Sequence, residues 1–473
     1  MVFSSTVFLF IFFPVTYILY VIVPSIKAKN AFLIITSLLF YAFGEPITVF
    51  LMIFSVFVNY LVGIAISKAK GKGKPALIIA LAFDLLILGV FKYAGFITQT
   101  INTVFRLNIP VPDIRLPIGI SFFTFQIMSY IIDVYKDKKL VQKNFFNVLL
   151  YISLFPQLIA GPVVKYYDVA QQIDNRSITV ENTAQGLKRF ICGLSKKILI
   201  ANAVGGAADA MFALSGDELS ALTCWLGGIT YTIQIYFDFS GYSDMAIGLG
   251  KMLGFTFREN FNYPYIAESM QDFWRRWHIS ISSWFKEYLY IPLGGNRKGK
   301  LRTALNKIIV FFFTGLWHGA NMTFVVWGLV HGMFLMFESY KIIPLEKIKF
   351  KPVKHFYTMI VVIVTFVIFR AENLTQAFTY ISNMFTGFNI SYASKSIFFE
   401  QFDYHFIFIV ILGILFSCPI VGTVSNKIYS KAAGTASKLL FECTSYVITL
   451  AMFFLCIVSL ASSTFNPFIY LQF

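Results

Sequence analysis

Long apolar stretches separated by short polar segments dominate this 473-residue chain. A helix needs about 20 mostly apolar residues to cross a bilayer, so some of the shorter stretches are expected to form partial spans. The two longest are predicted to hold two elements each, bent at Gly241 or Gly319. Leu116–Phe123 is predicted to be a helix entry with a Pro/Gly hinge, and Pro156–Gln157 and Gly161–Pro162 are predicted to interrupt another apolar run. The apolar stretches cover residues 2–24, 31–44, 47–66, 76–100, 118–133, 145–160, 220–255, 306–338, 355–371, 405–424 and 439–463. The pattern predicts an all-α, polytopic integral membrane protein.

Composition and charge support this prediction. The chain is 57% hydrophobic and 13% charged, with a mean hydropathy of +0.71, whereas soluble proteins are about half apolar and about a quarter charged. A net charge of +16 could indicate a nucleic-acid partner. However, Lys and Arg gather in the segments between apolar runs, which is the distribution of cytoplasmic loops beside anionic lipid headgroups. Membrane lipids are therefore expected as partners, and nucleic acid is not.

The basic loops also predict an orientation. Placing residues 67–75, 134–144, 341–354 and 425–438 in the cytoplasm puts both chain termini on the extracytoplasmic side. The first stretch, Val2–Pro24, lacks a basic start and a small-residue cleavage site, so it is interpreted as a retained helix.

We expect one membrane-embedded domain over residues 1–473. Its N-terminal transmembrane helices are expected at 1–160, a catalytic core with tilted or re-entrant helices at 161–340, and C-terminal transmembrane helices at 341–473. The chain has no phosphate-binding loop and no dinucleotide fingerprint. The five cysteines are scattered without a C-x-x-C pair, which indicates buried thiols, and the histidine spacing predicts no metal site.

A histidine in the apolar stretch 308–337 is the first candidate for chemistry. His318 follows Trp317 and precedes Gly319, and Asn321 is expected on its helical face at i+3. An ionisable group at membrane depth is a functional candidate by default, and neutral His is the commonest general base. The alternative is a core histidine that bonds to a carbonyl of a kinked helix. Trp317 and Gly319 are predicted to shape the space for a ligand.

A second candidate closes the run from Phe273 to His278. Arg275 and Arg276 in this run could grip the phosphates of an anionic donor, or they could belong to an interfacial belt of Trp and Arg. On a helix, His278 would have Trp274 at i−4.

A Pro/Gly turn at residues 290–298 delivers Arg297 and Lys298 to one surface. A cytoplasmic, phosphate-bearing donor could bind there, and a plain positive-inside loop explains the two residues equally well.

Two acids and one more histidine are not expected to take part in catalysis. Asp238 and Asp244 are expected to pair structurally with Arg275 or Arg276. His331 lies thirteen residues after His318, about 220° around an ideal helix, so the two are not expected to share a ligand.

Four blocks of the sequence resemble the membrane-bound O-acyltransferases. They are Phe237–Ala246, Phe273–Ser280, Tyr288–Lys298 and Leu316–Ala320. More narrowly, the chain is similar to the bacterial alginate O-acetyltransferase branch, which is related to proteins of peptidoglycan and cellulose acetylation and of D-alanine transfer to teichoic acids. The resemblance implies a helical shell around a thinned centre, with funnels from both faces.

It also implies roles for residues. The invariant histidine of the family matches His318, and its second histidine matches His278. An acyl group enters from the cytoplasm and leaves towards an extracytoplasmic acceptor, usually through a separate secreted or membrane-tethered acetyltransferase.

These observations lead to one main hypothesis. The chain is expected to accept an acetyl group from acetyl-CoA, with no bound cofactor, and to pass it across the cell membrane for O-acetylation of a polysaccharide. His318 would act as general base or transient acyl carrier, and His278 would position the donor or the imidazole. A transporter of polysaccharide or lipid-linked sugar, lined by the same polar residues, is the alternative. A non-catalytic scaffold for an export complex is the third.

Overall fold

The computed structural model describes residues 1–71, 73–431, 434–462 and 468–469, and among these residues it contains helices and no strand. The prediction of an all-α protein is confirmed. The chain divides into two compact units. The described residues of the first unit lie within 1–190 and 243–259, and those of the second lie within 191–242 and 260–469. The expectation of one domain with boundaries at 160 and 340 stays a prediction.

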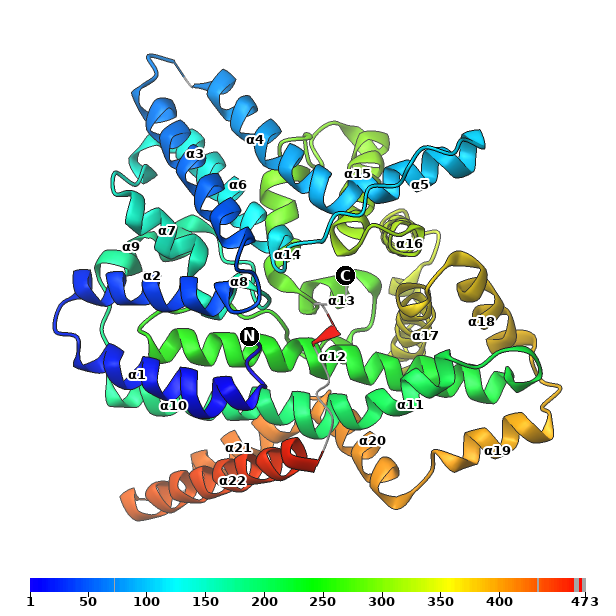
Figure 1. The fold of residues 1–473 in the computed structure, drawn as a ribbon. Coiled ribbons are helices and arrows are strands. Elements are labelled where there is room, and N and C mark those ends of the chain that lie inside the picture. Colours follow the sequence, from blue (N-terminus) through cyan, green and yellow to red (C-terminus); the bar gives the residue numbers. More distant parts are fainter. Residues whose placement is uncertain (72, 432–433, 463–467, 470–473) are drawn as a thin grey trace. The chain divides into compact units, whose positions relative to one another are not determined.

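The first unit is a bundle of helices from the N-terminal part of the chain (Figure 1). Helix α6 packs against α3 and α4, and α2 packs against α7. The helices of this unit are α1 (Phe13–Ile22), α2 (Ile26–Ala42), α3 (Thr48–Lys68), α4 (Lys74–Leu88), α5 (Ala94–Phe105), α6 (Ile120–Lys136), α7 (Phe145–Ser153), α8 (Phe155–Leu158) and α9 (Tyr166–Asp174). Helix α10 (Val180–Ser195) starts in this unit and ends in the second.

Glycine determines where α6 begins. Gly119 precedes the helix with a φ of +77°, a conformation that only glycine adopts without strain. A Cβ there would also lie 2.9 Å from the carbonyl oxygen of Leu158. The helix entry predicted within Leu116–Phe123 is confirmed.

The segment after α7 is irregular and buried. Helix α7 ends at Ser153, α8 covers only Phe155–Leu158, and residues 159–165 form no further helix although they are buried. The sequence predicted these breaks from Pro156 and Gly161–Pro162. Buried, non-helical backbone at membrane depth is tolerated where protein covers it.

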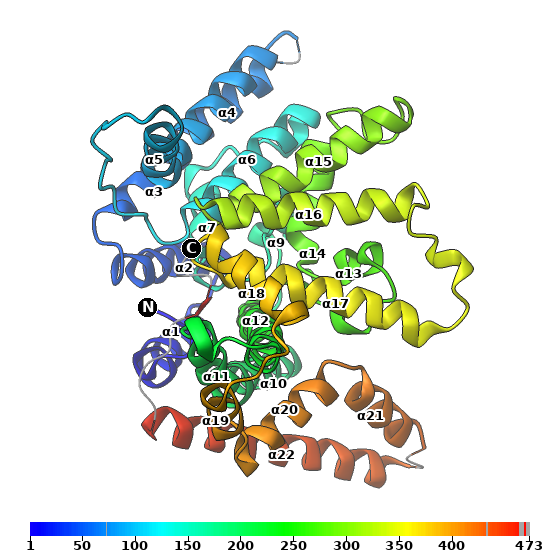
Figure 2. The same cartoon turned by 90° about the vertical axis from the view of Figure 1, so that its right-hand side faces the viewer.

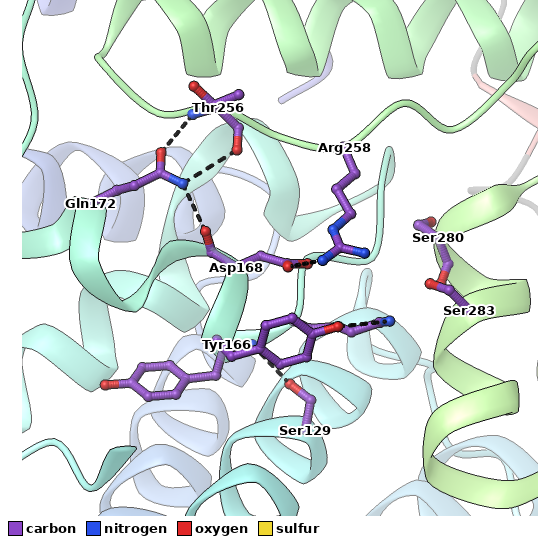
Figure 3. Close-up of polar contacts among 10 residues, drawn as sticks. Ser129, Tyr166, Asp168, Gln172, Thr256, Arg258, Ser280 and Ser283 are labelled. Carbon is purple, nitrogen blue, oxygen red and sulfur yellow. Dashed lines mark hydrogen bonds and ion pairs between the residues drawn. The ribbon is translucent and has the colours of Figure 1, made fainter. Parts of the chain in front are cut away.

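Polar contacts fix α9 to the segment at residues 253–259 of the first unit (Figure 3). The carboxylate of Asp168 accepts from the Arg258 guanidinium at 2.5 Å, and the Gln172 amide oxygen accepts from the Thr256 backbone N–H at 2.7 Å. The Ser129 hydroxyl of α6 accepts from the Tyr166 backbone N–H at 3.3 Å. This network anchors an otherwise short helix from both sides.

The second unit contains the remaining helices. It contains a hairpin of α15 and α16, and α17 packs against α16 (Figure 2). The helices of this unit are α11 (Asn202–Phe212), α13 (Met270–Arg276), α14 (Ile279–Phe285), α15 (Gly299–His318), α16 (Met322–Ser339), α17 (Lys351–Arg370), α18 (Leu374–Thr386), α19 (Tyr392–Glu400), α20 (Tyr404–Phe416), α21 (Ile420–Lys431) and α22 (Thr435–Ser462). The long helix α12 (Ala221–Met252) starts in the second unit and ends in the first.

The two glycines that were predicted to bend helices behave differently. Helix α15 ends at His318 and α16 begins at Met322, so the break at Gly319 is confirmed. Helix α12 continues through Gly241 (Figure 1), so the predicted bend there is wrong. A Cβ at Gly241 would lie 2.6 Å from the carbonyl oxygen of Gly193, and the glycine therefore permits α10 and α12 to approach closely.

Among the described residues, six helices are long and apolar enough to cross a membrane, or seven if the bent pair α19 and α20 forms one span. These spans are Thr48–Lys68, Lys74–Phe105, Val180–Phe212, Met322–Ser339, Lys351–Arg370 and Thr435–Ser462. The predicted position of the C-terminus concerns residues 470–473, which lie outside the described residues.

Candidate active site

A row of buried His and Trp rings occupies the second unit. Neighbouring ring centroids in this aromatic row lie 4.8–5.7 Å apart. Its members, in spatial order, are His278, Trp317, His318, Trp327, His331 and Trp274. They come from the junction of α13 with α14 and from α15 and α16. The two histidines that the sequence proposed as catalytic, His278 and His318, thus both pack against the indole of Trp317.

His318 is the last residue of α15 and is only 4% exposed. Its ring makes edge contacts with Trp327, at 5.0 Å, and with Phe369 of α17, at 5.2 Å. Because α15 ends here, Asn321 is not on the helical face of His318, and that prediction is wrong. The Asn321 amide caps α16 by accepting from the Thr323 backbone N–H at 3.0 Å, and it donates to the carbonyl of Glu372 at 2.8 Å.

Gly319 allows an aromatic ring of α16 to pack closely against the end of α15. A Cβ at this position would lie 2.2 Å from the ring of Phe324, so the missing side chain makes room for that ring. The role of Gly319 in shaping the space for a ligand stays a prediction. Glycines also set the distance between the two helices of the hairpin. A Cβ at Gly328 would lie 2.2 Å from the carbonyl oxygen of Phe311, and one at Gly315 would lie 2.3 Å from that of Phe324.

His278 is fully buried and stands at the start of α14 with a φ of +43°. A non-glycine residue in this region is strained, and such strain is concentrated at functional sites. The Oδ1 atom of Asn260 lies 3.0 Å from His278 Nδ1. The same oxygen accepts from the Ser280 backbone N–H at 3.2 Å and from the Ser280 hydroxyl at 2.8 Å.

These contacts determine the tautomer of His278. A backbone N–H can only donate, so the Asn260 atom that receives it is the oxygen, and His278 must donate to it through Nδ1. Nε2 then carries a lone pair and is a proton acceptor. Burial lowers the pKa of the imidazole to about 3, because desolvation disfavours the charged form. The neutral ring therefore offers Nε2 as a hydrogen-bond acceptor.

Helix α13 ends at Arg276, so Trp274 is not on a helical face with His278, contrary to the prediction. The Trp274 ring packs against His331 at 5.2 Å instead.

The basic residues that were predicted to bind a donor lie in different surroundings. Arg275 is exposed. Arg276 forms an ion pair with Asp272 of its own helix at 2.9 Å and donates to the carbonyl of Asn262 at 3.2 Å. Arg297 and Lys298 are exposed in the turn before α15. That helix has 20 residues and is therefore about 30 Å long, which separates Arg297 and Lys298 from His318 by its whole length.

The two acids have other partners than expected. Asp238 forms a buried ion pair with Lys197 and accepts from the backbone N–H of Ile469 at 2.8 Å. Within the first unit, Asp244 pairs with Arg189 at 2.8 Å. The predicted pairing of Asp238 with Arg275 or Arg276 is wrong, although its structural role is supported. Helix packing decided the partners, and sequence spacing carries no information on that packing.

Three residues of the site were not proposed from the sequence. Asn260 fixes His278, and its signal would have been its place in the polar segment before α13. Trp327 and His331 are spaced by four residues on α16, and this spacing alone could have indicated a shared face. In the described part of the chain, His, Cys, Asp and Glu form no group of three or more that could hold a metal ion. Cys224 and Cys456 are buried, whereas Cys443 is exposed, contrary to the expectation of buried thiols.

Comparison with known proteins decides the family. The family model of the membrane-bound O-acyltransferases matches residues 37–382, which include the whole aromatic row. The chain belongs to the membrane-bound O-acyltransferase family. It is thus an O-acyltransferase and a multi-pass membrane protein.

Relatives narrow the group further. The chain is 44% identical over 393 residues to the probable alginate O-acetylase of Pseudomonas putida, with 82% of this chain and 80% of the relative covered. It is 38% identical to that of Azotobacter vinelandii over the full length of both. It is 36% identical to the peptidoglycan O-acetyltransferase of Helicobacter pylori, with 84% of this chain and 82% of the relative covered. The resemblance seen in the sequence is confirmed.

Proposed function

We propose that this O-acyltransferase moves an acetyl group from cytoplasmic acetyl-CoA across the cell membrane for O-acetylation of an extracytoplasmic polysaccharide. The names of the relatives support acetyl as the group and a glycan as the class of acceptor. The observation that carries the proposal is the packing of His278 and His318 on one buried indole, Trp317. Two imidazoles packed on one indole can together move a proton and hold a reacting group.

In this proposal, His318 is the general base that deprotonates the attacking hydroxyl, or it carries the acetyl group transiently. His278 accepts a hydrogen bond or a proton at Nε2. The carbonyl carbon forms a bond to the hydroxyl oxygen and loses its bond to the CoA sulfur, and the hydroxyl proton reaches the thiolate through the imidazole.

The donor is expected to approach from the side of the basic loops. Arg297 and Lys298 are exposed and would attract its phosphates from the cytoplasm, while Arg275 and Arg276 would do so nearer to His278. Arg297 and Lys298 can contact a donor whose thioester lies at His318 only if the donor spans about the length of α15. Both termini are proposed to be extracytoplasmic, with a secreted or membrane-tethered acetyltransferase as partner for the final transfer.

The test uses purified full-length protein in liposomes, with isotope-labelled acetyl-CoA on one side. Wild type is expected to release CoA and to deliver label to protein, partner or glycan on the far side. His318→Ala is expected to lower CoA release by about 10³-fold or more. Folded protein in both preparations is verified by gel filtration and thermal unfolding.

Equal turnover by both proteins would remove His318 from the chemistry. Movement of a glycan across the membrane with no consumption of acetyl-CoA would favour the transporter alternative.

A further inference from the structure

His331 has a defined tautomer that the proposed reaction has not used. The ring is fully buried, and its Nδ1 atom lies 3.2 Å from Nε1 of Trp274. The indole N–H can only donate, so Nδ1 of His331 accepts and its proton resides on Nε2. The histidine therefore presents an N–H donor on the side of the ring away from that hydrogen bond.

Within the described part of the chain, this donor has no hydrogen-bond acceptor. The same is true of the indole Nε1 of Trp327, which is 1% exposed, and of the Thr323 hydroxyl, which is fully buried. Thr323, Trp327 and His331 are spaced by four residues each on α16, so they share one face at intervals of about 6 Å. Buried donors without acceptors are rare in native proteins and usually mark a bound water, ion or ligand.

The position of two of these donors relates them to the chemistry. The ring of Trp327 lies between those of His318 and His331, at centroid distances of 5.0 Å and 4.8 Å. Trp327 is thus in direct contact with the proposed catalytic imidazole and His331 is one ring further along the row, with apolar rings such as Phe311 and Phe369 around them. A neutral donor pair in apolar surroundings suits an oxygen that gains negative charge during a reaction.

We infer that Trp327 Nε1 and His331 Nε2 bind the carbonyl oxygen of the acyl group that is transferred at His318. When the hydroxyl oxygen attacks the thioester carbon, the carbonyl π electrons move to this oxygen, and both N–H groups donate to the resulting oxyanion. The electrons return to the C–O bond as the sulfur leaves. The role of Trp274 is to position His331, because its N–H holds the imidazole in the donating tautomer. This inference rests on the proposed acetyl transfer.

Matched substitutions of His331 distinguish the role of its Nε2 donor from that of its Nδ1 acceptor. His331→Asn retains an oxygen near Nδ1 for Trp274 and removes the Nε2 donor, whereas His331→Gln retains an amide N–H near Nε2. Trp327→Phe keeps an aromatic ring and removes its N–H. We expect His331→Asn and Trp327→Phe each to lower kcat for acetyl-CoA by about 10²- to 10³-fold, with little change in KM. His331→Gln should recover most of the loss.

A second measurement does not depend on turnover. The infrared carbonyl stretch of ¹³C-labelled acetyl-CoA is recorded in liposomes that contain the His318→Ala protein. Two donors should move this band to a lower frequency than in water-free solvent. Adding His331→Asn or Trp327→Phe should move it part of the way back.

An identical band and unchanged kcat in these variants would overturn the inference, since a buried water would then occupy the donors. The proposed function would survive that result if His318→Ala still abolished turnover. Movement of a glycan by the wild type without consumption of acetyl-CoA would instead remove the proposed function itself, and the inference with it.

Discussion

Two imidazoles of the second unit, His278 and His331, are equally buried but held in opposite states. His278 donates through Nδ1 to Asn260, which leaves Nε2 as an acceptor. His331 accepts at Nδ1 from Trp274, which leaves Nε2 as a donor. They lie on opposite sides of His318 in the aromatic row.

The difference shows that the hydrogen-bond partner of a buried histidine determines whether its other ring nitrogen donates or accepts. Both residues are neutral rings among aromatic side chains, and the sequence does not indicate that their tautomers differ. A side-chain carbonyl produces a proton acceptor at one end of the row, and an indole N–H produces a donor at the other. An acyl transfer needs both, because one group must take a proton while another stabilises negative charge on oxygen.

The largest effect is expected from removing the partner of His278. Asn260→Leu has a similar volume but offers no acceptor, so the imidazole can take the other tautomer and lose its basic Nε2. We expect acetyl transfer to fall by about 10²-fold or more. Asn260→Asp keeps an oxygen that accepts from Nδ1, and it should retain clearly more activity than the leucine variant. Steady-state CoA release measures both.

Equal rates in the two variants at equal protein stability would show that the tautomer of His278 is irrelevant.

A medium effect is expected from separating α15 and α16, the hairpin that aligns Trp327 with His318. In Gly328→Ala the new methyl group meets the Phe311 carbonyl, so the helices must move apart, at a cost of about 1–3 kcal/mol. The unfolding temperature in detergent should therefore be lower than that of wild type, and acetyl-transfer activity should fall as well. Gly206→Ala is the matched control, because nothing lies within 4 Å of a Cβ at that helical position.

The control should be neutral or stabilising by up to about 1 kcal/mol. A loss of stability in the control that equals the loss in Gly328→Ala would refute the explanation by close packing.

The smallest effect concerns pH. The folded-state pKa of His278 is lowered to about 3 from an ordinary value of about 6.5. The unfolded chain therefore binds more protons between these values, and stability falls as pH drops below about 6.5. One such group changes the free energy of unfolding by at most about 1.4 kcal/mol per pH unit. Unfolding temperatures at pH 7.5 and pH 5 should differ less in His278→Gln than in wild type.

If the unfolding temperatures at pH 7.5 and pH 5 differ as much in His278→Gln as in wild type, His278 is not the group whose protonation destabilises the fold.

The sequence was a good guide to where helices begin and end at proline and glycine. Gly119, Gly161–Pro162 and Gly319 interrupt helices as expected, because their backbone preferences are local. Gly241 was misjudged, since the reason for that glycine is the backbone of Gly193 on another helix. The lengths of the apolar stretches, supported by the composition, were enough to predict an all-helical membrane protein.

The candidate site was predicted only in part. His278 and His318 were identified, and the structure brings both against Trp317. His331 was set aside because one continuous helix would have turned it away from His318. The break after His318 folds α16 back along α15, and this tertiary arrangement places Trp327 between the two histidines. Spacing along a chain cannot reveal such a contact.

The most direct test of the opposing tautomers is ¹⁵N solid-state NMR of histidine-labelled protein in lipid bilayers. The chain has only five histidines, so single substitutions can assign each signal. We expect a neutral His278 with its proton on Nδ1 and a neutral His331 with its proton on Nε2. Trp274→Phe should allow His331 to change its tautomer and should leave the tautomer of His278 unchanged. The same tautomer in both rings, or a charged ring at either position at pH 7, would contradict the account.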